Sequence, residues 1–104
     1  MENMGTNEVM VGIKKEVEIY ISPNLAIKLL KNKIGSLKQA QYVIYSTILF
    51  TCLGDRSDNK LLLDVQGISR LTRIVPLQVS KSLSVLLNKE IISETEDGYY
   101  YVLR

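Results

Sequence analysis

The 104-residue sequence contains no histidine and only one cysteine, Cys52. The absence of histidine excludes imidazole acid–base catalysis, Ser-His-Asp triads and histidine metal sites. A single cysteine excludes an intramolecular disulfide and any metal cluster held by several thiolates. Cys52 lies in the apolar run Ile48–Leu53, which favours a small core residue over a reactive thiol.

Strong charge and long apolar runs are also missing. Thirteen basic residues stand against 11 acidic ones, a net charge of +2, which excludes a histone-like polycation and an acidic solvating tail. The longest uncharged stretch, residues 39–54, is too short and too polar to span a bilayer, and no signal peptide opens the chain. No phosphate-binding loop is present, and the carboxylates are scattered. We therefore expect a cytoplasmic protein that is not an enzyme and that uses no cofactor, metal, membrane or small-molecule ligand.

What the sequence does contain is a hydrophobic fraction of 46%, enough for one folded core in a chain of this length. The first patterned segment, Val17–Ile21, alternates apolar and polar residues and predicts a half-buried strand. Ser22 and Pro23 then predict a helix start, with the serine as N-cap and the proline at the first helical position. This helix is expected to end at residues 34–35.

The middle of the sequence predicts a central helix followed by a loop and a short strand. Ser36 is expected to cap the helix, which runs to about Leu53 and is apolar around most of its circumference. A polar loop over residues 54–60 leads to a strand at Leu61–Leu63.

Two further helices and a hairpin complete the predicted elements. Asp64 is expected to cap a short helix, and residues 72–75 form a turn because Val75 precedes Pro76. Asp97 and Gly98 predict a hairpin between strands at Ile91–Thr95 and Tyr99–Leu103. The apolar side chains expected to face inward are Val65, Ile68 and Leu71 on the short helix and Val79, Leu83, Leu86 and Leu87 on the longer one.

A short helix, a tight turn, a longer helix and a hairpin follow one another in the order of a winged helix-turn-helix. Residues 68–83 resemble the common winged-helix pattern of leucines at three-residue intervals, then a proline, then valine-serine-arginine-x-leucine, and residues 88–92 resemble the stretch that leads into the wing. The resemblance covers residues 36–104. It implies an α+β, mainly helical winged helix-turn-helix domain of the kind found in small prokaryotic, archaeal, viral or plasmid transcriptional regulators.

Residues 1–35 lie outside this resemblance and are expected to form a strand and helix extension. A lone strand cannot bury its own face, so the strand at Val17–Ile21 is expected to pair with Leu61–Leu63, with the wing or with its copy in another chain. The last of these favours a homodimer built through the extension and the central helix.

Two residue choices depart from the family pattern. Glu90 stands where a glycine commonly ends the recognition helix, so this end is expected to close without a left-handed residue. The wing carries Glu94, Glu96 and Asp97 where basic residues often reach the phosphates, so we expect it to contact DNA weakly.

The outer face of the helix over residues 76–89 carries the predicted base-reading side chains. Glutamine can pair with an adenine edge, lysine with guanine or phosphate, serine with either, and valine with a thymine methyl. Any amphipathic helix also turns polar residues outward, so this face alone does not require DNA. At 100° per residue the candidates are Gln78, Lys81, Ser84, Val85 and Asn88, with Ser80 added from the family motif.

Positive charge is concentrated in the middle of the chain. Residues 21–75 carry eight basic residues against three aspartates, a net +5, whereas the segments before and after are net acidic. Arg70 and Arg73 lie on the helix and turn that approach the DNA backbone in helix-turn-helix docking, so we expect them to contact phosphates, and Lys38 to join them. A solvated basic face is the alternative interpretation.

These observations favour a sequence-specific double-stranded DNA-binding protein, a small dimeric transcriptional regulator that places residues 76–89 in the major groove. One alternative is an origin-binding or replication-control protein of a phage or plasmid, because the stretch from Leu37 onward is similar to the N-terminal domain of phage replication proteins. A second alternative is a winged-helix module for protein–protein interaction, which the acidic wing favours.

Overall fold

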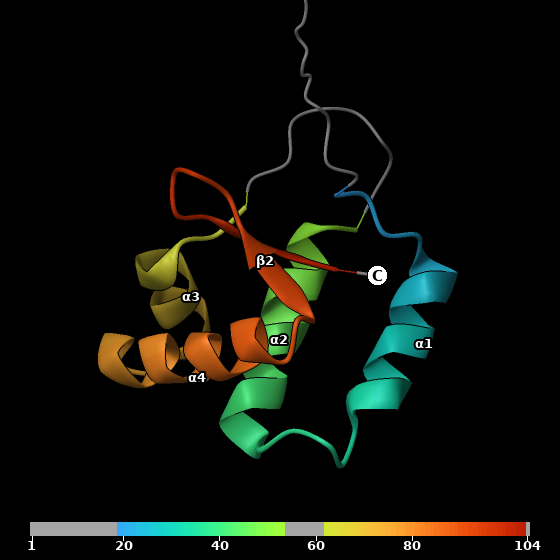
Figure 1. Ribbon diagram of the computed structural model, residues 1–104, viewed down its shortest axis with the longest axis horizontal. Coiled ribbons are helices and arrows are strands. Elements are labelled where there is room, and N and C mark those ends of the chain that lie inside the picture. The colour runs from blue at the N-terminus through green and yellow to red at the C-terminus, as the bar shows by residue number, and fades with distance from the viewer. Residues whose placement is uncertain (1–18, 54–61, 104) are drawn as a thin grey trace, which may run out of the picture.

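Residues 19–53 and 62–103 are described by a computed structural model of the chain. This part is an α+β fold, mainly helical, as the sequence predicts. Helices α3 and α4 pack on one side of α2, while α1 lies along the other side (Figure 1). The elements are α1 (Pro23–Lys33), α2 (Gln39–Thr51), α3 (Val65–Thr72), α4 (Pro76–Asn88), β2 (Ile92–Glu94) and β3 (Tyr100–Val102).

Helix α1 has the predicted bounds because its ends are set by local chemistry. The Leu25 N–H donates to Ser22 Oγ at 3.3 Å, which satisfies one of the free donors of the first turn. At the other end Gly35 takes a left-handed φ of +84° just beyond the helix. Ala26 and Leu29 are buried, so the inner face of α1 is covered by the same chain.

The start of α2 lies two residues later than the sequence predicts. The N-cap is Lys38 and not Ser36, because the Ser36 hydroxyl donates instead to the Lys33 carbonyl at 3.1 Å within the turn. The Lys38 N–H donates to Gln41 Oε1 at 3.2 Å and so holds the first turn without a conventional cap.

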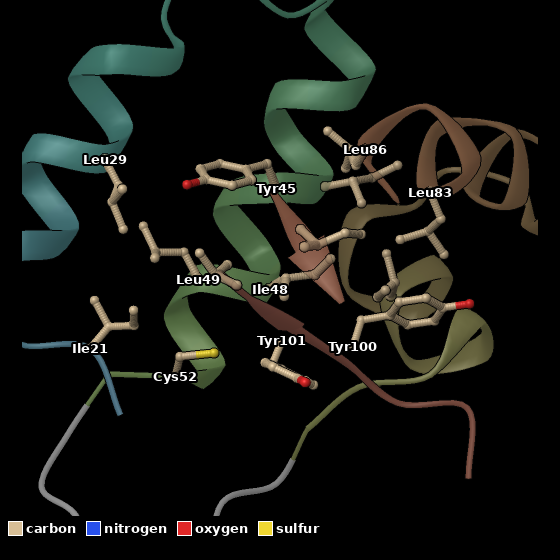
Figure 2. Packing of buried hydrophobic residues seen from close by; sticks show 14 of the residues in the cluster. Ile21, Leu29, Tyr45, Ile48, Leu49, Cys52, Leu83, Leu86, Tyr100 and Tyr101 are labelled. Atoms are coloured by element: carbon tan, nitrogen blue, oxygen red, sulfur yellow. The ribbon is translucent and has the colours of Figure 1, made fainter. Parts of the chain in front are cut away.

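Helix α2 is the central element, as its nearly all-round apolar character predicts. It contacts α1, α3, α4 and β3, so its side chains fill the space between them (Figure 2). Cys52, at its C-terminal end, is fully buried, which confirms the prediction of a small core residue. The buried side chains of α2 are Ile44, Tyr45, Ile48 and Leu49.

Ile21, in the predicted N-terminal strand, pairs within the chain with a partner that is not one of those predicted. Ile21 forms a one-residue parallel bridge to Leu53, and its N–H donates to the Cys52 carbonyl at 2.8 Å. Within the chain, the segment that ends α2 therefore pairs with Ile21 in place of the expected Leu61–Leu63 or wing. Pairing with a second chain stays a prediction. Val17 and Glu18, the first two residues of the predicted strand, lie outside the described residues.

Helix α3 begins at its predicted cap. Asp64 Oδ1 accepts a 2.8 Å hydrogen bond from the Gly67 N–H. Gly67 also has a packing role, because a Cβ at this position would lie 3.0 Å from Leu63 Cδ2. The predicted inner face is partly wrong: Ile68 is buried, but Leu71 is 66% exposed.

The hairpin forms around the predicted Asp97-Gly98 turn, where Gly98 has a φ of +90°. The paired strands are shorter than predicted, with Ile92 opposite Val102 at one end and Glu94 opposite Tyr100 at the other. Leu63 adds a one-residue antiparallel bridge to Tyr100, whose N–H donates to the Leu63 carbonyl at 3.0 Å. Tyr100 and its neighbour Tyr101 are both buried, so side chains on both faces of this strand are covered.

The C-terminal end of α4 closes through a left-handed residue, contrary to the prediction. Glu90 has a φ of +61°. Its N–H donates to the Leu87 carbonyl at 3.0 Å, and the Ile91 N–H donates to the Leu86 carbonyl at 3.3 Å. This is the Schellman arrangement, in which the apolar residue after the turn normally packs back on the helix. The hydrogen bonds and the burial of Leu86 impose on a glutamate the conformation that glycine usually adopts.

Glu90→Gly is therefore expected to raise the free energy of unfolding by about 0.5 to 1 kcal/mol, because glycine relieves the left-handed strain at some cost in chain entropy. Urea denaturation measures the change. Glu90→Ala is the matched control, since it removes the same charge from the helix end but keeps a Cβ. Equal stabilities of the two variants would contradict the idea that strain at this position is relieved.

Tyr45→Phe is expected to raise the free energy of unfolding by about 1 kcal/mol at neutral pH. Among the described residues nothing accepts from or donates to the buried Tyr45 hydroxyl, which reaches from α2 towards α1 (Figure 2). Burial, helped by nearby Cys52 and Tyr42, raises the pKa of Tyr45 to about 12. The folded chain thus holds this proton more tightly than the unfolded chain, so native stability falls as the pH rises from about 10 to about 12.

Denaturation curves recorded across that pH range measure this effect. In the Tyr45→Phe variant the free energy of unfolding should fall less between about pH 10 and about pH 12 than in the native protein. Tyr42→Phe is the control, because the Tyr42 hydroxyl donates to the Leu30 carbonyl at 3.3 Å. The free energy of unfolding of that variant should be about 1 kcal/mol lower at neutral pH. It should still decrease at alkaline pH as in the native protein. If the free energy of unfolding of Tyr45→Phe depends on pH as that of the native protein does, the pKa of Tyr45 is the same in the folded and unfolded chains, which contradicts the prediction.

Candidate nucleic-acid interface

The turn between α3 and α4 is fixed by side-chain hydrogen bonds. The Ser69 hydroxyl donates to the Ile74 carbonyl at 2.6 Å. Thr72 Oγ1 donates to the Ile68 carbonyl at 2.7 Å and accepts from the Ile74 N–H at 3.3 Å. Arg73, between them, ends α3 with a left-handed φ of +62°. The direction in which α4 leaves α3 is therefore set by several bonds at once.

The inner face of α4 is largely as predicted. Val79, Leu83 and Leu86 are buried, and Leu87 is half-buried. Ser82 is buried as well, which the sequence does not reveal because serine is usually exposed. Packing of this face on α2 and α3 leaves the opposite face of α4 on the surface.

The outer face of α4 carries the predicted side chains with one difference. Val85 is half-buried at the flank of the face. Gln78 is exposed, but its side chain lies along the helix towards the next turn. Its Nε2 donates weakly to Ser82 Oγ at 3.5 Å. Exposed along this helix are Gln78, Ser80, Lys81, Ser84 and Asn88.

The predicted phosphate-binding residues are all exposed but fall into two places. Arg70 lies in the last turn of α3 and Arg73 in the turn that follows, so both lie within six residues of the start of α4. Lys38 is the N-cap of α2 and so belongs to a different element from the two arginines. The charged loop over residues 54–60, which contributes to the basic middle of the sequence, lies outside the described residues.

The N-terminal end of α4 is open to an anion. Val75 occupies the N-cap in an extended conformation and makes no side-chain cap bond, and the first turn of this helix holds no acidic residue. The backbone N–H groups of Leu77 and Gln78 therefore point out of the helix end without a side-chain acceptor from the cap. Helix ends of this kind attract phosphate oxygens through the N–H groups and the helix dipole.

Three apolar side chains that the sequence analysis does not place on the surface are exposed beside this helix end. Leu71 is 66% exposed, Val75 64% and Leu77 68%. The angular count that selects Lys81 and Ser84 also places Leu77 on their face, so that count would have found it. Nothing in the local sequence marks the other two as exposed.

The hairpin presents the predicted acidic surface. Glu94, Glu96 and Asp97 are all exposed, and the hairpin turn is short. Carboxylates here repel phosphates, so the hairpin side of the surface is less favourable for nucleic acid than the α3–α4 side.

Residues 19–53 and 62–103 hold neither a cluster of metal-ligating residues nor a membrane-spanning helix. Nowhere in these ranges do three or more histidine, cysteine, aspartate or glutamate residues gather as a metal site would require. No helix within them combines the length and the apolar character needed to cross a membrane.

Comparison of the chain with models of protein families, with curated protein sequences and with solved structures gives no match in any of the three.

Proposed function

We propose that residues 36–104 form a winged helix-turn-helix domain that binds double-stranded DNA. The observation that carries the proposal is α4, whose polar outer face lies opposite a fully buried stripe and follows a tightly bonded turn with two exposed arginines. The order α2, Leu63 bridge, α3, α4 and hairpin is compatible with a winged helix. The resemblance of residues 68–92 to the winged-helix pattern supports the same assignment.

In this proposal α4 enters the major groove with its N-terminal half towards the base edges, as recognition helices do. Lys81 pairs with guanine or phosphate, and Gln78 pairs with adenine after leaving its weak bond to Ser82. Ser80, Ser84 and Asn88 supply further donors and acceptors along the same helix, and Val85 contacts a thymine methyl from the flank.

Arg70 and Arg73 contact phosphates beside the N-terminal end of α4, and the open end of this helix adds backbone N–H groups. The acidic wing stays away from the backbone. With few phosphate contacts, non-specific affinity is modest and specific binding depends on base contacts. Lys38 joins only where the DNA also reaches the start of α2.

The proposed biological role is that of a small transcriptional regulator, with origin binding in phage or plasmid replication as the alternative. Both roles use the same surface, so the surface does not distinguish them. The position of the bound site in the DNA does: a promoter supports regulation, and an origin supports replication control.

The test is binding of duplexes selected from a random pool. Lys81→Ala is expected to weaken binding of the selected duplex ten- to hundredfold, because it removes a base or phosphate contact at the centre of the face. Arg73→Ala should weaken all duplexes alike and reduce the slope of log affinity against log salt by about one. Fluorescence anisotropy at several salt concentrations measures both.

Lys31→Ala is the matched control, since it removes an equally exposed positive charge from α1. It should change affinity and salt slope little. Absence of duplex binding at low salt, together with protein partners that survive nuclease treatment, would replace the DNA proposal by a protein-interaction module.

We also propose that the chain forms a homodimer, through α2 more than through the N-terminal extension. The inner face of α1 is already covered by α2, so this face is not available for contact with a second chain. Val43 and Phe50 remain exposed on α2, seven residues apart and so on one face of the helix, with Phe50 68% exposed. Two copies that bury this face give each other a second half-site on DNA.

Phe50→Ser is expected to shift the chain from dimer to monomer in sedimentation equilibrium at micromolar concentration. Ile27→Ser, which changes an exposed apolar residue on α1, should leave the dimer intact. If Ile27→Ser gives a monomer and Phe50→Ser a dimer, the dimer forms through the N-terminal extension. A native protein that is monomeric at all concentrations would contradict the homodimer proposal.

A further inference from the structure

The surface beside the start of α4 holds an apolar group that the proposed polar contacts do not use. We call Leu71, Val75 and Leu77 the turn cluster. Each is about two-thirds exposed, although together they span only seven residues. Single exposed leucines are common on proteins, whereas several together on one surface segment indicate a contact.

The turn cluster is not a displaced part of the core. Thr72 and Ile74 are half-buried on the inner side of the same segment, and the Thr72 hydroxyl is bonded to the backbone at both ends of the turn. The inward positions of the segment are therefore occupied. Leu71 and Val75 flank Arg73, whose left-handed backbone marks the tip of the turn.

Leu77 connects the turn cluster with the proposed base-reading face. It lies four residues before Lys81 and seven before Ser84, and these spacings place all three on one ridge of α4. Leu77 is the residue of this ridge closest to the N-terminal end, the part of a recognition helix that reaches deepest towards the bases.

The chemistry around the turn cluster selects its partner. Arg70, Arg73 and Lys81 surround it in sequence and are exposed, so the partner has to offer both negative charge and apolar groups. Duplex DNA offers both in the major groove, where phosphates line the rim and the thymine C5 methyl is the apolar group on the base edges.

We propose that the turn cluster reads thymine methyl groups at the end of the site nearest the start of α4, with Leu77 as the main contact. This inference rests on the proposed DNA binding. It differs from the base contacts above, because it assigns part of the specificity to apolar residues of the turn and the first turn of α4.

The test replaces thymine by deoxyuridine, which lacks only the C5 methyl. In a selected duplex, one or two such replacements within the site are expected to weaken binding by the native protein about fourfold each, the value of one buried methyl group. Replacements outside the site are the DNA control and should have no effect. Competition anisotropy measures the ratio of affinities for the thymine and uracil duplexes.

Leu77→Asn is the protein variant, and circular dichroism establishes that it remains folded, as its exposed position leads us to expect. In this variant the thymine-to-uracil ratio should fall to one at the affected positions. Ile27→Ser, an equally apolar exposed residue on α1, should keep the native ratio.

The outcomes separate the two proposals. If no selected duplex binds at all, the proposed function fails and this inference fails with it. If duplexes bind but uracil never weakens binding, this inference and the Val85 contact proposed above are overturned, whereas the proposed DNA binding stands. If the uracil effect persists in Leu77→Asn and disappears in Val85→Ser, the methyl is read from the flank of α4 and the turn cluster is not its reader.

Discussion

Burial of α2 between two groups of elements is the constraint on which the rest of the fold depends. Ile48 and its buried neighbours touch α1 on one side and α3, α4 and β3 on the other (Figure 2). Because the buried side chains of α2 itself have no polar atoms except the Tyr45 hydroxyl, they hold the elements by close packing and not by specific bonds. The outer face of α4 is available only because its inner face is taken up by this core.

Specific bonds are concentrated where packing cannot fix direction, at the two ends of α4. Ser69 and Thr72 hold the turn before it, and the two Schellman hydrogen bonds close the turn after it. Both turns contain a non-glycine residue with a left-handed backbone, Arg73 and Glu90. The left-handed conformation of each such residue lowers the stability of the fold by about 1 to 2 kcal/mol. The surrounding contacts must therefore favour this placement of α4 strongly.

The net charge of +2 is unevenly distributed over the molecule. The described surface near the turn carries Arg70 and Arg73, whereas the hairpin carries Glu94, Glu96 and Asp97. A polyanion that approaches the proposed interface is therefore drawn to the α3–α4 side and repelled from the hairpin. In the proposed function this asymmetry orients the domain on DNA, while affinity depends on base contacts, apolar contacts and a second copy.

The sequence by itself determined the elements whose ends depend on neighbouring residues. Ser22 and Pro23 begin α1, Asp64 caps α3, Pro76 begins α4, and Asp97-Gly98 turns the hairpin, because caps and turns are made within a few residues. The angular count also places most of the exposed face of α4, including Leu77, which the choice of polar candidates passed over.

Only the tertiary structure decided which residues meet across the chain. Ile21 pairs with Leu53, Leu71 turns outward while Thr72 and Ile74 occupy the inner side, and Glu90 adopts the left-handed conformation. Each of these depends on contacts with elements distant in sequence or on the closing of a helix against the core. Local propensity cannot specify them, because the free energy that decides each one comes from the packing around α2.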